Sequence, residues 1–440
     1  MVKSSEMYDG DGHWCHSLNA PMTALQFLSR HSLYRGSLQH YKLMFPIHVL
    51  PYYFHERSTS RGPARIINRN CLDQGVVNGV VCTAGGRTIA AAVRDSARLT
   101  HLSRGMQRML NNFRANMAGK PINLVLDWDG TLTKKDTMFV MGRMADLRSK
   151  RLELPGDPLA AWEGFAKAYM EDYAAYEARY EPKARSRTDR EAESAWLKRL
   201  EDVEVRSAAR VQKHAFLRGV KREDINLAAR KSVETGEVSL RPGWQKLLAL
   251  SATAEEDPVG TSLNGQVSIL SVNWSEAFIR ASLKESAQYS DTEEIRDRLH
   301  KSIDALPILS NELASLESNY GSTGRLSEAG RPRIRTSYDK LMNFKREAEH
   351  LNVYVGDSTT DFDALLAADV GICICDDPMG SGQKGLADTF ARVGCEVTHI
   401  DQADSHGLHG PTLLWARDLN EIYHFLLASQ RLGDGTRSEG

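Results

Sequence analysis

The sequence has few cysteines and no long hydrophobic run, and each shortage removes a class of protein. The six cysteines among 440 residues follow neither a zinc-ligand spacing nor a paired framework, which is the pattern of a reducing compartment. The apolar stretch at 43–51 contains two prolines and is far shorter than the ~20 residues of a membrane span. We therefore expect neither a disulfide-stapled secreted protein nor a membrane protein.

Acidic residues are scarce in the first 118 positions, which hold fourteen Lys or Arg against six Asp or Glu. This arm carries +8, whereas the whole chain carries −1. It has no recognisable nucleic-acid-binding module and no periodicity typical of a core, so we expect no nucleic-acid partner and a poorly ordered arm over 1–118. Glu6, Asp9 and Asp11 are unusual for a transit peptide, which favours a cytoplasmic over a mitochondrial location.

The most informative segment lies at 122–133, where a short apolar strand ends in two carboxylates. Ile122 to Leu126 is apolar apart from one Asn, as expected of a strand buried in a parallel sheet. Asp127 and Asp129 follow it directly, and Gly130 allows the chain to turn. Because open α/β sheets bind ligands at the carboxyl ends of their strands, both aspartates are candidate site residues.

Further polar residues occur where other predicted elements end or begin. The apolar strands at 267–270 and 353–355 both lead into polar side chains, and an amphipathic segment begins between them. The residues concerned are Ser271, Asn273, Lys340, Asp357 and Asp361.

This series of motifs resembles the haloacid dehalogenase-like (HAD) hydrolase superfamily over about residues 120 to 400. The run Asp-Gly-Thr-Leu-Thr at 129–133 and the pair Asp136-Thr137 place the resemblance in the phosphoserine-phosphatase-like branch. It implies catalytic roles for four residues: Asp127 as nucleophile, Asp129 as general acid/base, Ser271 as the hydroxyl that holds the phosphoryl group, and Lys340 as the charge clamp.

The same resemblance implies a Mg²⁺ cofactor and contacts to a substrate. The side chains of Asp127 and Asp357 and the main-chain carbonyl of Asp129 would hold the metal. Asp361 would bind it through water, orient Lys340, or cap the helix that follows. Asp136 and Asn273 would contact the substrate, although a helix N-cap explains Asp136 nearly as well.

The chemistry of phosphate ester hydrolysis independently explains why residues of these types would be needed. A carboxylate nucleophile divides hydrolysis into two displacements, but an anionic phosphate repels it unless a hard cation lies between them. Asp129 could protonate the leaving oxygen and then activate water, which contributes ~10²- to 10⁴-fold. Dehalogenation needs no such acid, so Asp129 favours phosphate chemistry.

Five short apolar runs with helical patterns between them predict a doubly wound, parallel α/β sheet. The runs are 122–126, 267–270, 306–309, 353–355 and 370–375, and a further short strand is expected within 394–400. HAD-like cores order the five strands 5-4-1-2-3, which would place the aspartates after the first strand beside those after the fourth.

The segment 134–240 is too long for a plain crossover between the first two strands. Its helical periodicity predicts a helical cap domain inserted after the first strand, in which the basic run 183–187 is expected to be exposed to solvent. The core domain would then comprise 119–133 and 241–430, followed by a disordered tail at 431–440.

The sequence thus predicts a Mg²⁺-dependent phosphatase that acts on a small phosphorylated metabolite. A phosphomutase or phosphotransferase of the same fold, or a HAD-like binding or regulatory protein without turnover, stays open. Neither the substrate nor the oligomeric state is indicated.

Overall fold

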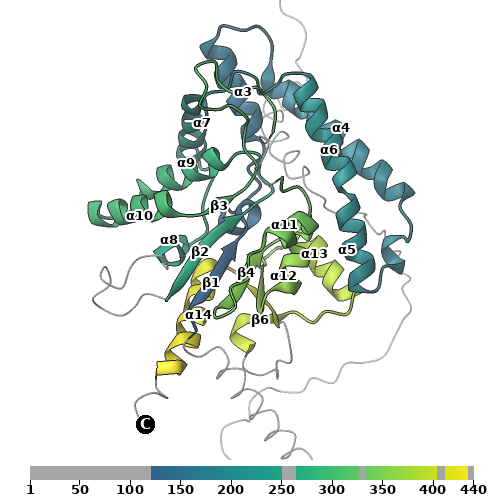
Figure 1. The fold of residues 1–440 in the computed structure, drawn as a ribbon, viewed down its shortest axis with the longest axis vertical. Helices are drawn as coiled ribbons and strands as arrows, with labels where there is room; N and C mark the ends of the chain where they lie inside the picture. The colour runs from purple at the N-terminus through teal and green to yellow at the C-terminus, as the bar shows by residue number, and fades with distance from the viewer. Residues whose placement is uncertain (1–119, 250–263, 327–332, 404–411, 435–440) are drawn as a thin grey trace, which may run out of the picture.

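A seven-stranded parallel sheet forms the centre of the computed structural model, which describes residues 120–249, 264–326, 333–403 and 412–434 (Figure 1). The predicted N-terminal arm lies outside the described residues. The strands are β1 (Ile122–Leu126), β2 (Gly265–Leu270), β3 (Ile308–Leu309), β4 (Leu351–Gly356), β5 (Val370–Ile374), β6 (Thr398–His399) and β7 (Thr412–Ala416).

The order of the strands is β3-β2-β1-β4-β5-β7-β6, and each neighbouring pair is parallel. The predicted order of the first five strands is therefore confirmed. The predicted strand within 394–400 is present as β6, whereas β7 was not predicted and inserts between β5 and β6. Leu126 is paired with both Ile269 and Val355, so the carboxyl ends of β2, β1 and β4 lie at one edge of the sheet.

Helices cover both faces of the sheet, because alternate residues of the central strands point to opposite sides. Leu124 and Leu126 join one apolar cluster, whereas Val125 joins the other. The first cluster is completed by α8 (Trp244–Leu248), α9 (Glu276–Ala287), α10 (Glu293–Ala305) and α14 (Leu419–Asp434), and the second by α12 (Phe362–Ala367) and α13 (Ser381–Arg392). Helix α11 (Ser337–Asn343) packs against α12. This is the doubly wound arrangement that the sequence predicted, although α14 extends into the segment that was expected to be a disordered tail.

A helical insertion follows β1, as predicted. It contains α3 (Val140–Arg151), α4 (Pro158–Arg179), α5 (Arg190–Arg199), α6 (Glu201–Lys213) and α7 (Arg222–Glu234). The chain leaves and re-enters the core side by side, because Thr133 pairs with Leu240 and the Arg241 N–H donates to Leu132 O at 2.8 Å. The first residues of the insertion are thereby fixed next to the end of β1.

Helix α5 is tied to the core through polar side chains. Glu193 Oε2 accepts hydrogen bonds from Arg392 Nη1 of α13 and from Arg187 Nε, both at 2.7 Å. The Ser194 hydroxyl donates to Asp363 of α12. Arg187 is buried in this contact, so the expectation that the whole basic run 183–187 is exposed is wrong.

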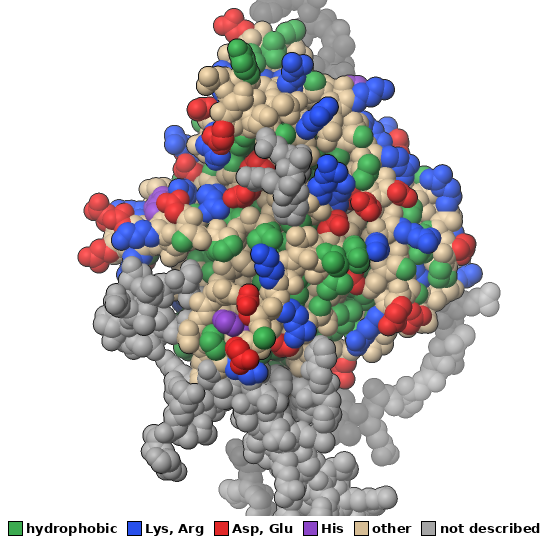
Figure 2. Space-filling view, in the orientation of Figure 1, with side chains coloured by type: hydrophobic (Ala, Val, Ile, Leu, Met, Phe, Trp, Pro, Cys, Tyr) green, Lys and Arg blue, Asp and Glu red, His purple; other side chains and the backbone are tan. Residues whose placement is uncertain are grey.

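The surface carries both signs of charge. Figure 2 shows acidic and basic side chains interspersed over this face of the described residues. Within the same described part of the chain, no helix has both the length and the apolar character needed to cross a membrane.

Candidate active site

Asp127 begins the site at the carboxyl end of β1. Its N–H donates to Val355 O at 2.9 Å, which continues the pairing of β1 with β4 for one further residue. The carboxylate is buried, and Lys340 Nζ of α11 lies 2.9 Å from its Oδ1. The predicted nucleophile and the predicted clamp are therefore in direct contact across more than two hundred residues of sequence.

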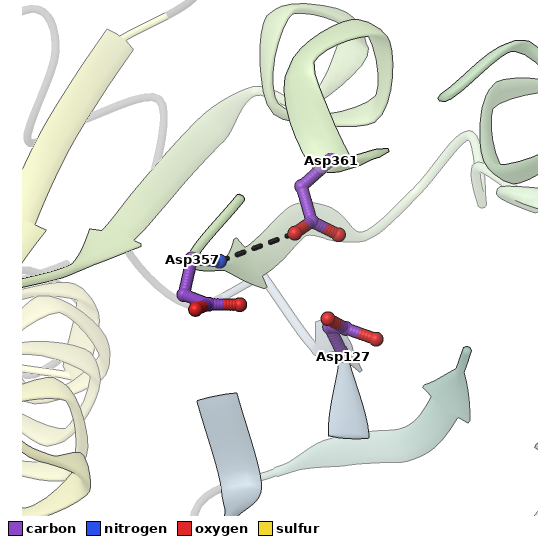
Figure 3. A group of neighbouring side chains, drawn as sticks. All are labelled: Asp127, Asp357 and Asp361. Atoms are coloured by element: carbon purple, nitrogen blue, oxygen red, sulfur yellow. Dashed lines mark hydrogen bonds between the residues drawn. The ribbon is translucent and has the colours of Figure 1, made fainter. Parts of the chain in front are cut away.

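Lys340 also bonds to Asp361, and both side chains are completely buried. Nζ lies 2.6 Å from Asp361 Oδ1, which also accepts a hydrogen bond from the Tyr354 hydroxyl at 2.8 Å. Asp361 Oδ2 accepts from the Asp357 N–H at 3.1 Å (Figure 3). The Ser358 N–H donates to the same oxygen, also at 3.1 Å. Of the roles that the sequence left open for Asp361, these contacts favour the orientation of Lys340.

Three carboxylates converge at the ends of β1 and β4. One oxygen of each of Asp127, Asp357 and Asp361 lies within 4.8 Å of the others (Figure 3). Asp357 is held only loosely by the Thr131 hydroxyl, which donates to its Oδ1 at 3.4 Å. The backbone makes room for Asp357, because Gly130 has φ +74° and a Cβ at this position would overlap with the Asp357 carboxylate.

Burial and the repulsion between neighbouring carboxylates shift the pKa values of this group far from their usual ranges. Burial, together with the charge of Asp361, raises the pKa of Asp127 to about 8, although Lys340 acts in the opposite direction. The pKa of Asp357 lies well above its usual range for the same reasons. Burial alone would lower the pKa of Lys340, but the carboxylates of Asp127 and Asp361 outweigh it and raise that pKa.

The donor set suits a divalent cation. Three buried carboxylates face one buried ammonium, which leaves negative charge without a counter-charge among these four groups. Carboxylate oxygens are the ligands that Mg²⁺ prefers. Asp127 and Asp357 are the residues whose carboxylates remain to hold such an ion, because Asp361 is already engaged by five donor groups.

Asp129 lies beside this group but turns its carboxyl away from it. Its Oδ1 accepts hydrogen bonds from the Thr137 N–H at 2.7 Å and the Thr137 hydroxyl at 2.6 Å. Its Oδ2 accepts from Asn273 Nδ2 at 2.9 Å. The sequence predicted the main-chain carbonyl of Asp129, and not its carboxyl, as the metal ligand, and these contacts of the carboxyl agree with that prediction.

The other predicted residues lie at different depths. Ser271 directly follows β2 with its side chain buried, and its Oγ accepts from the Asn273 N–H at 3.1 Å. Asp136 lies on the cavity wall and accepts a hydrogen bond from the Met138 N–H at 2.8 Å, which leaves the substrate contact as a prediction. The alternative role as a helix N-cap is wrong, because the N-cap of α3 is Phe139. Burial and the charge of Asp129 raise the pKa of Asp136 well above its usual range.

A cavity of about 270 Å³ opens beside Asp127 and Asp129. Its wall is formed by the first residues of the insertion, 134–136, by the turn after β4, and by the start of α13 at 380–383. Lys340, Ser271 and Asn273 lie behind this wall and not on it. The cavity therefore gives an incoming molecule access to the aspartates on its wall, whereas the residues that support them are buried behind it.

Arg241 is a site residue that the sequence marked only as the return to the core. Its buried guanidinium donates to Gly130 O from Nε and Nη2, at 3.2 and 2.8 Å. It also forms two hydrogen bonds with Asp376, at 2.6 and 2.9 Å. These contacts join the end of the insertion, the turn after β1 and the cavity wall, and no sequence signal indicated them.

The chain has relatives of low similarity among known proteins. No protein-family model matches it. It is 26% identical over 271 residues to the bifunctional TH2 protein, mitochondrial, of Arabidopsis thaliana, in a match that covers 56% of this chain and 38% of that protein. The chain thus spans well under half of this relative's length.

Solved structures with some similarity include two of phosphoserine phosphatase. One is a phospho-aspartyl intermediate analogue, at 13% identity and a TM-score of 0.33, with 70% of this chain and 99% of that chain covered. The other is a substrate-bound complex, at 13% identity and a TM-score of 0.34, with 70% and 98% covered. A HAD family hydrolase of Salmonella enterica serovar Typhi has 14% identity and a TM-score of 0.28, with 58% and 63% covered.

The architecture of this chain can be described without these distant similarities. The strands follow the order β3-β2-β1-β4-β5, and the insertion follows β1. Asp127 and Asp357 lie directly after β1 and β4, and the buried Lys340 contacts Asp127 and Asp361. Together these features form the doubly wound α/β arrangement that the resemblance of the sequence to HAD-like hydrolases predicts.

Proposed function

We propose that this protein is a Mg²⁺-dependent phosphatase that hydrolyses a small phosphomonoester through an aspartyl-phosphate on Asp127. The observation that carries the proposal is the contact of Asp127 with Lys340 at 2.9 Å, beside the carboxylate of Asp357 and at the edge of a cavity. This contact supports the proposal because it would put a nucleophile, a cation for the phosphoryl oxygens and two metal ligands in one place.

The reaction would proceed in two displacements. An Asp127 carboxylate oxygen attacks phosphorus while the bond from phosphorus to the leaving oxygen breaks, and Asp129 gives that oxygen a proton. A water molecule then attacks the same phosphorus, and Asp129 takes a proton from it. Inorganic phosphate leaves, and Asp127 returns to its carboxylate form.

The remaining residues would compensate the negative charge of the phosphate and of the nucleophile. Mg²⁺ held by Asp127 and Asp357 would neutralise negative charge between the nucleophile and the phosphate. Lys340 places a compact positive charge beside Asp127, and Asp361 holds Lys340 there. Ser271 follows β2 directly and lies behind the cavity wall, so its contact with a phosphoryl oxygen stays a prediction.

The substrate is proposed to be a small metabolite, because the cavity has a volume of about 270 Å³. We also propose that the helical insertion acts as the cap that covers it. This proposal is supported by residues 134–136, which begin the insertion and already line the cavity wall. A cap of this kind excludes water and selects the substrate.

The test is phosphate release from a panel of phosphomonoesters, with and without Mg²⁺. The wild-type protein is compared with Asp127→Asn and with Asp388→Asn, which alters an exposed carboxylate of α13. We expect Mg²⁺-dependent release by the wild type and Asp388→Asn, and a loss of at least ~10³-fold in Asp127→Asn, because an amide is a poor nucleophile.

Three other outcomes would contradict the proposed function or the role of Asp127. Release that survives in Asp127→Asn, with folding verified by circular dichroism, would overturn Asp127 as nucleophile. Transfer of the phosphoryl group to a second alcohol without release of phosphate would establish the phosphomutase or phosphotransferase alternative. Folded wild-type protein that neither releases nor transfers phosphate would favour the non-catalytic alternative.

A further inference from the structure

The carboxyl group of Asp129 is held by donors from two distant segments. The Thr137 N–H and hydroxyl reach its Oδ1, at 2.7 and 2.6 Å, from the start of the insertion. Asn273 Nδ2 reaches its Oδ2, at 2.9 Å, from the segment after β2. The side chains of all three residues are buried, so water does not compete freely for these bonds.

The direction of the Thr137 hydroxyl is fixed by its other neighbours. Trp128 Nε1 donates to Thr137 Oγ1 at 3.1 Å, and Asn273 Nδ2 lies 3.2 Å from the same oxygen. A hydroxyl accepts two hydrogen bonds and donates one. Because both accepting positions are in use, its hydrogen points to Asp129.

The orientation of the Asn273 amide is fixed in the same way. Its Oδ1 accepts a hydrogen bond from the Ser275 N–H at 3.1 Å. The nitrogen of the amide must then face Asp129, since the opposite orientation would set an oxygen against the Asp129 carboxylate. The Asn273 side chain is thus fully used within the protein, which leaves it no donor for a substrate.

The two oxygens of Asp129 are left unequal by these contacts. Oδ1 accepts two hydrogen bonds and has no lone pair in the carboxyl plane to spare, whereas Oδ2 accepts one. Asp129 lines the cavity in which the ester would bind. Oδ2 is therefore the oxygen that can meet a further polar atom.

We propose that Thr137 and Asn273 are positioning residues that hold the Asp129 carboxyl and direct its Oδ2 to the leaving-group oxygen of the ester. The assignment rests on the proposed function, because it gives these residues a part in the proton transfer by Asp129. It adds that Thr137 acts through its hydroxyl, and that Asn273 acts on the acid and not on the substrate.

Two aryl esters separate this role from a merely structural one. Nitrophenolate departs without a proton, whereas the more basic phenolate of phenyl phosphate needs the acid. We compare kcat/KM for 4-nitrophenyl phosphate and phenyl phosphate in the wild type, Thr137→Val, Thr137→Ser and Asn273→Ala. Thr137→Val keeps the shape of the side chain but removes the hydroxyl, whereas Thr137→Ser keeps the hydroxyl.

We expect Thr137→Val and Asn273→Ala to lose about tenfold more activity on phenyl phosphate than on 4-nitrophenyl phosphate. Thr137→Ser should keep the wild-type ratio between the two esters. If Thr137→Val fails to fold by circular dichroism, the ratio measured in Asn273→Ala decides.

The assignment is overturned if folded Thr137→Val or folded Asn273→Ala loses equal activity on both esters or loses none. Wild-type protein that releases no phosphate from either ester, or Asp127→Asn that releases as much as the wild type, would overturn the proposed function and this assignment with it. Wild-type activity that depends on Asp127 but shows no change in the ratio would overturn the positioning role alone.

Discussion

Lys340 and Asp361 form a completely buried ion pair, in which Nζ lies 2.6 Å from Oδ1. The same ammonium lies 2.9 Å from Asp127, so one cation serves two carboxylates and leaves Asp357 to a different partner. A buried pair of this kind is costly to break, because its removal leaves a charge uncompensated in the interior. The geometry of the site and the stability of the fold are therefore coupled through Lys340.

Asp361→Asn should lower both stability and activity. The amide removes one of the two negative charges that face Lys340 and places a donor where an acceptor is needed. We expect the free energy of unfolding to fall by about 3 kcal/mol, measured by urea denaturation. Asp388→Asn, which alters an exposed pair with Lys384, should change it by less than about 0.5 kcal/mol. A loss below about 1 kcal/mol in Asp361→Asn would contradict the account of this pair.

Much of this arrangement could be predicted from the sequence, because strands buried in a parallel sheet have a strong signal. The apolar runs at β1, β2, β4 and β5 located the central strands, and Asp127 and Asp357 follow two of them directly. The order of the five strands came from the family resemblance, since periodicity alone does not say which strands are neighbours. β7 was missed because no motif marks the short run 412–416, although this strand lies between β5 and β6 in the sheet.

The polar contacts behind the cavity could not be predicted, since they depend on which side chains meet in three dimensions. Asn273 was expected to contact the substrate, yet its amide is bonded to Asp129 and Thr137. Arg187 lies in a basic run that reads as a solvated surface, and its burial depends on Glu193. No local pattern distinguishes these residues from ordinary exposed ones.

Gly130→Ala should abolish activity and destabilise the protein. The residue has φ +74°, and a methyl group there would overlap with the Asp357 carboxylate. We expect a loss of at least ~2 kcal/mol in the free energy of unfolding and of at least ~10²-fold in kcat/KM. Gly164→Ala is the matched control, because it lies within α4 with nothing near its Cβ position. It should be neutral or stabilising by up to about 1 kcal/mol, and equal effects of the two substitutions would contradict the prediction.

Asp357→Asn should remove most of the stabilisation that Mg²⁺ gives to the folded protein. A ligand that binds only the folded state raises the melting temperature, and a chelator reverses the rise. We expect millimolar Mg²⁺ to raise the melting temperature of the wild type by a few degrees and that of Asp357→Asn by much less. Asp136→Asn, which alters the cavity wall outside the carboxylate cluster, should keep the shift. Equal shifts in the wild type and Asp357→Asn would place the metal elsewhere.

The stability of the protein should also depend on pH through Glu204 of α6, which lies outside the carboxylate cluster of the site. Its Oε1 accepts a hydrogen bond from the Tyr169 hydroxyl of α4 at 2.7 Å. Burial raises the pKa of Glu204 from 4.5 to about 7, although the hydrogen bond from Tyr169 and the charge of Arg335 act in the opposite direction. Between these two values the folded protein holds a proton on Glu204 that the unfolded chain has lost.

The sign of the effect follows from this difference in bound protons. The stability that protonated Glu204 provides is complete below pH 4.5 and is lost as the pH rises through about 7. Glu204→Gln keeps an acceptor for Tyr169 but carries no charge, so its stability should fall less between pH 5 and pH 8, by about 2–3 kcal/mol relative to the wild type. Urea denaturation at both pH values measures this difference, and buried groups common to the two proteins cancel. Glu201→Gln, on the exposed side of α6, is the control, and its free energy of unfolding should change with pH as that of the wild type does. If the free energy of Glu204→Gln changes in the same way, Glu204 is already ionised in the folded protein at pH 5.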